Sequence, residues 1–174
     1  MAIRRPPTVA EEIHQSRPFA SAGSEAAVTL RRTVAVLDRH YAPLFDAEEL
    51  SAPQYNVLRI LRGAGSGGLP TLAIRDRLVD LSPGITRLID RLEEAGLVVR
   101  DRGDEDRRQV LCRITPAGTA LLGKMERAVD QADRAVVAAL TPTEQRTLVR
   151  LLDQVRAGLR AGAGLPSPST RTDR

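Results

Sequence analysis

The apolar residues of this chain recur mainly three and four positions apart, which is the spacing of one face of an α-helix. A first stripe begins near Glu25 and continues to Tyr41, and Pro43 is expected to end that helix because proline interrupts helical hydrogen bonding. Two more stripes follow in the second half of the chain, over 122–140 and 148–159. The pattern therefore predicts a protein that is mostly α-helical.

Start signals mark several of these helices. The segments 51–54 (Ser-Ala-Pro-Gln) and 141–144 (Thr-Pro-Thr-Glu) have the form of a capping box, in which two side chains and two backbone N–H groups satisfy one another. Thr115, followed by proline, marks a third start. We expect the glycine-rich segment 63–68 to end the helix that begins after Ser51.

The segment 72–95 has the pattern of two helices joined by a turn. A short helix over 72–78 and a three-residue turn precede a second helix, which Ser82 as N-cap and Pro83 as first helical residue are expected to open. The second helix has one apolar stripe, formed by Ile85, Leu88, Ile89 and Leu92. Its outward side carries Thr86, Arg87, Asp90 and Arg91. This pattern is typical of a helix-turn-helix that reads the major groove of DNA, although an amphipathic helix with a solvated face has it too.

A highly charged run, RDRGDEDRR at 100–108, lies between two stretches with strand character at 97–99 and 109–115. We expect these stretches to form a β-hairpin, and a hairpin after a helix-turn-helix is a wing. Arg107 and Arg108 are candidates for minor-groove contacts, since a narrow A·T-rich groove concentrates negative potential. Asp106 is expected to hold Arg108 extended through an ion pair. The alternative is a solvated loop.

Composition sets three limits. Aromatic residues make up only 2% of the chain and Trp is absent, so the core is expected to be aliphatic. The formal net charge of +4 does not identify a DNA surface, because the segment 75–113 carries as many acidic residues as arginines. One cysteine excludes an internal disulfide and favours a reducing compartment, and no apolar run is long enough to span a bilayer. We therefore expect a cytoplasmic protein with no membrane partner.

The segment LSPGITRLIDRLEEAGLV at 81–98, followed by DEDRRQVLCRITPAGTALL at 104–122, resembles the multiple-antibiotic-resistance-regulator (MarR) family, over roughly 25–159. The resemblance implies a winged helix-turn-helix homodimer that binds palindromic double-stranded DNA. It also implies that Arg108, braced by Asp106, enters the minor groove. By position, the major-groove contacts would come from Ser82, Gly84, Thr86, Arg87 and Arg91. The turn at 79–81, often glycine-containing in the family, reads Val-Asp-Leu here.

These features predict an order of domains along the chain. We expect a flexible N-terminal extension over 1–23 and dimerisation helices over 24–50 and 115–160. The winged helix-turn-helix DNA-binding domain is expected over 51–114. A disordered tail is expected over 161–174.

Members of the family commonly release DNA when a small, often phenolic, molecule binds or when a cysteine is oxidised. A candidate pocket for a phenolic or lipophilic effector, with a simple core contact as the alternative, is the cluster His40, Tyr41, Phe45 and Tyr55. Cys112 is expected to be a small buried side chain, with a redox sensor as the alternative. The two histidines are too few and too scattered for a zinc site, so no metal or cofactor is expected.

The sequence therefore predicts a sequence-specific DNA-binding transcriptional regulator, as a homodimeric repressor of palindromic operators that a small effector releases. Two interpretations compete with it: a winged-helix module that binds protein instead of DNA, and a redox-sensing regulator that acts through Cys112. An enzyme is not expected, because the chain has no Ser/His/Asp set, phosphate-binding glycine loop or metal-ligand spacing.

Overall fold

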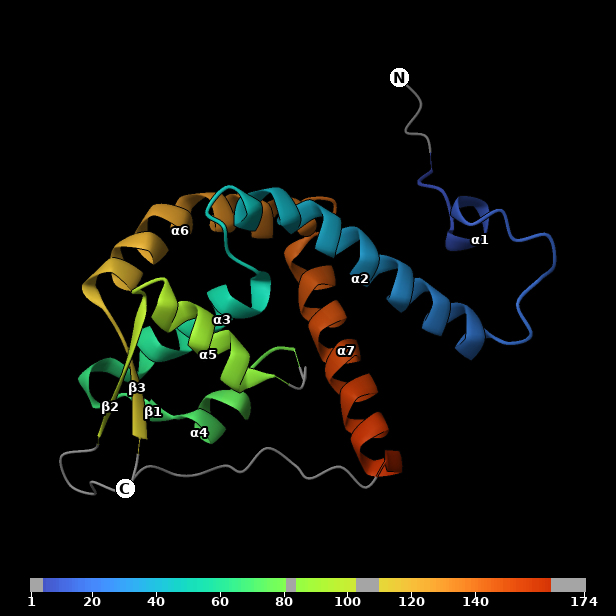
Figure 1. Cartoon of the computed structure of the whole chain (residues 1–174). Helices are drawn as coiled ribbons and strands as arrows, with labels where there is room; N and C mark the ends of the chain where they lie inside the picture. Colours follow the sequence, from blue (N-terminus) through green and yellow to red (C-terminus); the bar gives the residue numbers. More distant parts are fainter. Residues whose placement is uncertain (1–4, 81–83, 103–109, 164–174) are drawn as a thin grey trace. The chain divides into compact units, whose positions relative to one another are not determined.

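The computed structural model describes residues 5–80, 84–102 and 110–163 (Figure 1). The chain divides into two units, Met1–Pro43 and Leu44–Arg174. The mostly helical fold with a small β-hairpin, expected from the sequence, is confirmed. Within the described residues, no helix is both long and apolar enough to cross a membrane.

The N-terminal unit contains a one-turn helix and most of a long one. Helix α1 (Val9–Glu12) is opened by a capping box. Its last residue, Glu12, forms an ion pair with Arg32 of helix α2 (Ala22–Asp46), with 3.0 Å between the carboxylate oxygen and Nε. The segment for which we expected a flexible extension thus includes a helical turn that is tied to α2.

Helix α2 continues to Asp46, so the prediction that Pro43 ends it is wrong. Proline lacks an N–H and crowds the carbonyl four residues before it, but its fixed φ angle is compatible with a helix. Pro43 lies in the last turn, where only one hydrogen bond is lost and the helix ends soon afterwards. The chain then turns through Glu49, which has a φ of +52°.

Helix α3 (Ala52–Ala64) begins at the capping box that the sequence predicts. The N–H of Gln54 donates to Ser51 Oγ at 3.3 Å, and the N–H of Ser51 donates to Gln54 Oε1 at 2.8 Å. The helix ends inside the glycine-rich segment, as expected, and the 3-10 helix η1 (Gly65–Gly67) follows it. Both termini of α3 are therefore determined by local sequence.

The middle of the chain forms two helices, α4 and α5, and a three-stranded antiparallel sheet. The sheet has the order β1-β3-β2, and the predicted hairpin of β2 and β3 is confirmed. Helix α4 is shorter than the predicted 72–78. The elements in chain order are β1 (Leu69–Pro70), α4 (Thr71–Arg75), α5 (Ile85–Glu94), β2 (Val98–Arg102) and β3 (Val110–Ile114).

The core of this unit is aliphatic, as the composition predicts. Its aromatic members among the described residues are Phe45 and Tyr55, which are 8% and 7% exposed. Side chains that are almost completely buried come from α3, α4, α5, the hairpin and α6: Leu58, Leu61, Ile74, Ile89, Leu92, Val98, Cys112 and Leu122. The recognition-helix candidate α5 and the hairpin are thus held by one shared core.

Helix α6 (Pro116–Val136) starts at the predicted cap, where Thr115 Oγ1 accepts a hydrogen bond from the N–H of Gly118 at 3.0 Å. A Cβ atom at Gly118 would lie 2.5 Å from the carbonyl oxygen of Leu97, so only glycine fits there. The expected apolar stripe is buried at four positions, Leu122, Met125, Val129 and Ala132. The helix ends at Val136, four residues before the end of the predicted stripe.

Helix α7 (Pro142–Ala163) also begins at a predicted capping box. The N–H and Oγ1 of Thr141 both donate to a Glu144 carboxylate oxygen at 2.7 Å, and these hydrogen bonds lower the pKa of Glu144. Residues 161–163, predicted to begin a disordered tail, are helical, and the rest of that tail lies outside the described residues. The apolar side chains of α7 are largely exposed in the single chain.

Candidate nucleic-acid interface

The start of helix α5 differs from the prediction. The helix begins at Ile85 with Gly84 as N-cap, two residues later than expected; Ser82 and Pro83 lie outside the described residues. Gly84 has a φ of +140°, which is outside the helical range and is readily adopted only by glycine. A helix opened at Pro83 cannot run through this residue, so the predicted cap is wrong.

The two faces of α5 are arranged as the sequence predicts. Ile85, Ile89 and Leu92 are buried and Leu88 is half-buried. Gly84, Thr86, Arg87 and Arg91 are exposed. The helix therefore presents two guanidinium groups, a hydroxyl and a glycine to solvent from a rigidly packed support.

The end of α5 turns the chain directly into the hairpin. The N–H of Gly96 donates to the carbonyl of Glu93 at 2.9 Å, and the N–H of Leu97 donates to the carbonyl of Leu92 at 2.8 Å. This pair of bonds, with a φ of +70° at Gly96, is a Schellman motif. Strand β2 begins immediately afterwards, so α5 and the wing are neighbours in both sequence and space.

Arg100 of β2 connects the hairpin back to α5. Its Nη2 lies 2.5 Å from Asp90 Oδ1, and its Nη1 is hydrogen-bonded to Glu93. Burial alone would lower the pKa of Arg100, but hydrogen bonds to the two carboxylates raise it. Asp90, which the sequence places on the outward side of α5, is therefore engaged in an ion pair. The sequence analysis missed this group.

The opposite face of the hairpin is held by Arg113 of β3. Its Nη1 lies 3.1 Å from Asp101 Oδ2 on the neighbouring strand, and its Nε donates to the backbone carbonyl of Ser66 at 2.9 Å. The hairpin is thus connected on one face to α5 and on the other to η1. The residues assigned to the wing tip, Asp106, Arg107 and Arg108, lie outside the described residues.

The turn between α4 and α5 is tied to α3, although it lacks the glycine that is frequent in the family. The Asn56 Oδ1 atom accepts a hydrogen bond from the N–H of Val79 at 2.9 Å. Val79 itself is 87% exposed, so at this position the chain is held by the backbone N–H and not by the side chain. The side chain of Asn56 in α3 thereby fixes the backbone of Val79, a residue between α4 and α5.

The aromatic residues proposed for an effector pocket form two ring contacts. The His40 and Tyr41 rings meet edge to face, with 5.3 Å between centroids, and the Phe45 and Tyr55 rings are also 5.3 Å apart. Tyr55 lines a cavity of about 320 Å³, whereas Phe45 packs on Tyr55 from the core. Burial raises the pKa of the Tyr55 hydroxyl, and the charges of Arg59 and Arg62 partly oppose that shift.

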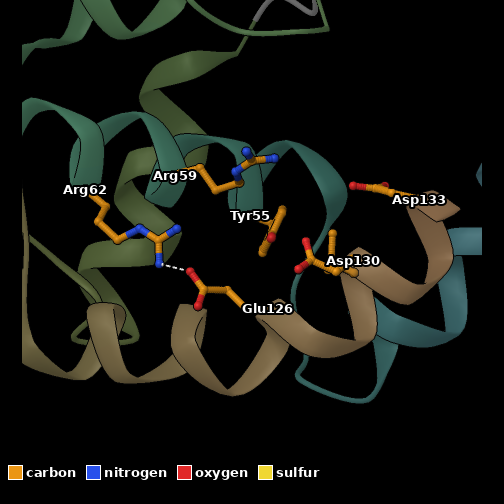
Figure 2. Close-up of a pocket in the computed structure, with 7 residues that line it drawn as sticks. Tyr55, Arg59, Arg62, Glu126, Asp130 and Asp133 are labelled. Atoms are coloured by element: carbon orange, nitrogen blue, oxygen red, sulfur yellow. Dashed lines mark hydrogen bonds and ion pairs between the residues drawn. The ribbon is translucent and has the colours of Figure 1, made fainter. Parts of the chain in front are cut away.

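Figure 2 shows that the cavity lies between α3 and α6 and that most of its lining is charged. Arg59 and Arg62 project from α3, and Arg62 forms an ion pair with Glu126 at 2.5 Å. The α6 wall carries Glu126, Val129, Asp130 and Asp133. The sequence indicates only the aromatic residues for a pocket, because the arginines and carboxylates of this cavity lie on helices far apart in the chain.

Cys112 is completely buried in the central strand, which confirms that it packs as a small apolar side chain. Its sulfur lies 3.9 Å from Thr71 Oγ1. Burial raises the pKa of the thiol, which disfavours the reactive thiolate. In the described part of the chain, no three His, Cys, Asp or Glu side chains are grouped so that they could hold a metal ion.

The chain has three helices, α3, α4 and α5, followed by a hairpin that is joined to α5 through Arg100. This arrangement defines a winged helix-turn-helix protein. The sequence model of the MarR family matches residues 50–110. A MarR transcription factor from Planctomyces limnophilus is 42% identical, with a TM-score of 0.60 over 79% of this chain and 99% of that one. This chain belongs to the MarR family.

Two further proteins are similar over most of their length. The putative transcriptional regulatory protein for the hcr operon of Thauera aromatica is 32% identical over 149 residues, which cover 84% of this chain and 85% of that protein. BpsR of Bordetella bronchiseptica, whose DNA binding is regulated by 6-hydroxynicotinic acid, is 25% identical. Its TM-score is 0.69, over 80% of this chain and 98% of that one. The family resemblance inferred from the sequence is therefore confirmed.

Proposed function

We propose that this chain is a homodimeric repressor that binds palindromic operator DNA through α5. The observation that carries the proposal is that this helix is buried on one side and exposed on the other. One side is fixed in the core, and the other exposes Thr86, Arg87 and Arg91. A guanidinium can bind guanine O6 and N7 through two hydrogen bonds, and a threonine can contact a base edge or a thymine methyl. Gly84, and by position Ser82, would lie at the end nearest the DNA.

The wing extends this interface into the minor groove. The family resemblance assigns Arg108 to the groove and Asp106 to bracing it, and Arg107 is a candidate from its place in the charged run of the hairpin. The support from the described residues is indirect. Strands β2 and β3 are paired from Val98 to Arg102. Ion pairs of Arg100 connect one face of the pair to α5, and a hydrogen bond from Arg113 connects the other face to the carbonyl of Ser66. A hairpin anchored in this way would present its tip beside α5.

A second copy of the chain would cover the apolar face of α7. Leu148, Leu151, Val155 and Leu159 recur along the helix and are between 39% and 67% exposed in the single chain. Large contiguous apolar surfaces are uncommon on monomers and usually mark an interface. A two-fold dimer also matches a palindromic DNA site, because each copy then addresses one half-site.

An effector would bind in the cavity between α3 and α6. Tyr55 offers a ring and a hydroxyl there, and Arg59 offers a positive charge 5.9 Å from that ring. These groups suit a small phenolic or heteroaromatic acid, and the regulation of BpsR by 6-hydroxynicotinic acid supports the same class. The aromatic cluster proposed from the sequence, His40, Tyr41 and Phe45 with Tyr55, stays a separate prediction, and of these residues Tyr55 lines the cavity.

A salt titration tests the DNA-binding function. Random duplexes are first selected against the full chain, and the affinity for the selected site is then measured between low and moderate salt. Because each neutralised phosphate releases counterions, log K should fall with log[salt] with a slope of about −0.9 per phosphate contact. A flat dependence, or failure to select an inverted repeat, would favour the competing protein-binding module.

The wing assignment has its own test. Arg108→Ala should weaken binding to the selected site and reduce the salt slope by about one contact, while the dimer stays intact. Unchanged affinity would exclude the wing contact but leave the function of α5 untouched.

A further inference from the structure

The ion-pair group around Arg100 joins the two elements that are proposed to contact DNA. Arg100 lies opposite Cys112 in the sheet and two residues beyond Val98, which is 1% exposed. Its guanidinium contacts Asp90 and Glu93, and its backbone N–H donates to Glu93 Oε1 at 3.2 Å. One strand residue is therefore hydrogen-bonded three times to carboxylates that lie one turn apart on α5.

The chemistry of this ion-pair group suits it to fixing the orientation of β2 against α5 more than to raising the free energy of unfolding. The guanidinium is planar and offers donors in a fixed fork, so it can hold two carboxylates only in a narrow range of orientations. Its side chain is 23% exposed, less than those of Asp90 (46%) and Glu93 (39%), so the cation is enclosed by its partners. A partly exposed ion pair contributes little to the free energy of unfolding. Its main effect is on how the strand lies against the helix.

Core packing holds the inner part of the hairpin. Val98 is buried near the base of the hairpin, and Cys112 is buried directly opposite Arg100. Beyond Arg100, strand β2 continues through Asp101 and Arg102 towards the segment that carries the proposed minor-groove arginines. A small tilt at the base produces a displacement that grows with distance along the strand. The Arg100 group lies level with Cys112, at the outer end of this buried part, where it can limit the tilt.

We propose that Arg100 is a positioning residue for operator binding, which sets the angle between α5 and the wing through Asp90 and Glu93. It thereby sets the spacing between the contacts in the major groove and those in the adjacent minor groove. The proposal rests on the DNA-binding function proposed above. It goes beyond that function by assigning specificity to a residue that need not touch DNA.

A simpler explanation is that Arg100 acts by its charge, by neutralising two carboxylates that would repel phosphate. Two substitutions separate these roles. Arg100→Lys keeps the charge but lacks the planar fork. Glu93→Gln removes a negative charge and replaces one of the two oxygens that accept from Arg100 with an N–H donor. Positioning predicts weaker operator binding by both variants. Charge neutralisation predicts normal binding by Arg100→Lys and tighter binding by Glu93→Gln.

The experiment uses the full chain and the duplex selected by the wild type. Both variants should bind it about tenfold more weakly, which is about 1.4 kcal/mol, with protection from hydroxyl radicals lost mainly at the base pairs next to the major-groove site. In the absence of DNA, amide hydrogen exchange should accelerate in β2 and β3 and stay unchanged in α3 and α6. Arg5→Lys is the matched control, since Arg5 forms an exposed ion pair with Glu11 in the N-terminal unit.

The outcomes are distinct. Normal affinity in both variants, or tighter binding by Glu93→Gln, would overturn the positioning role while leaving the DNA-binding function in place. Faster exchange throughout the molecule, with a uniform loss of protection along the DNA, would show a general structural role and would also overturn it. If the wild type selects no inverted repeat, the proposed function fails and the positioning role fails with it.

Discussion

Helices α5 and α7 both carry apolar residues three and four positions apart, yet they use that pattern in opposite ways. In α5, Ile89 and Leu92 are completely buried against the rest of the unit, and the polar side faces solvent. In α7, Leu151 is 47% and Leu159 is 67% exposed, so the apolar side is the one that faces solvent. The face left uncovered in the single chain differs in chemistry between the two helices.

This difference indicates which kind of partner each helix would bind. An exposed face of arginine and threonine on a rigid helix suits a polyanion with hydrogen-bonding groups, such as the edge of a base pair. An exposed face of leucine and valine suits another apolar surface, because burying it removes apolar area from water. Helical periodicity alone does not distinguish these cases, and burial within the chain does.

The largest expected effect tests the buried side of α5. Leu92→Ala removes a completely buried side chain and should lower the free energy of unfolding by about 2–5 kcal/mol, measured by urea denaturation. Leu159→Ala is the control on the exposed side of α7 and should lower it much less under conditions where the chain is monomeric. Equal losses in the two variants would remove the contrast between the helices.

The second effect tests the exposed apolar side of α7. Leu151→Asp would place a carboxylate in the proposed dimer interface and should weaken self-association by about 100-fold or more, because an unpaired charge is costly to bury. Sedimentation equilibrium measures the change, and Arg150→Asp at the neighbouring position is the control for added negative charge. A wild type that is monomeric at micromolar concentration would contradict the dimer itself.

The third effect tests the polar side of α5. Arg87→Ala should reduce discrimination between the selected site and single-base variants by about 1–3 kcal/mol, because the guanidinium can read a guanine edge. Competition binding over a set of substituted duplexes provides the measurement. If base preference is unaltered while affinity falls for all sequences alike, Arg87 contacts phosphate instead.

The smallest effect tests whether the thiol of Cys112 is shielded from water in the folded protein. Burial raises the pKa of this thiol above that of the unfolded chain, about 8.5, so the folded state retains the proton longer. The stability that this gives is fully present below pH 8 and is lost at higher pH, by at most about 1.4 kcal/mol per pH unit. Wild type and Cys112→Ala should therefore converge or cross between pH 8 and 10 in urea denaturation. Parallel curves would mean that the thiol is solvated in the folded protein.

Most of the fold could be predicted because its signals are local. The capping boxes at Ser51 and Thr141 and the cap at Thr115 each depend on residues within a few positions of one another. The errors arose at two residues that permit more than one backbone outcome. Pro43 is accommodated in a last helical turn, and Gly84 takes a φ of +140° that delays the start of α5.

The part of the candidate site that could be predicted is likewise the part that depends on local sequence. Exposure of Thr86, Arg87 and Arg91 follows from helical periodicity, which places them opposite the buried stripe. The contacts of Arg100 depend on how a strand lies against a helix, and the charged lining of the cavity depends on how α3 meets α6. Such relations between separate elements leave no pattern of spacing in the sequence.

The approach of α6 to the hairpin at Gly118 has a mechanical consequence. There the backbone of the helix lies against the carbonyl of Leu97, directly before β2, with no side chain between them. A side chain can absorb a shift by changing its rotamer, but two backbones in contact cannot. A sliding or tilting movement of the first turn of α6 would therefore be passed on to the root of the hairpin with little loss.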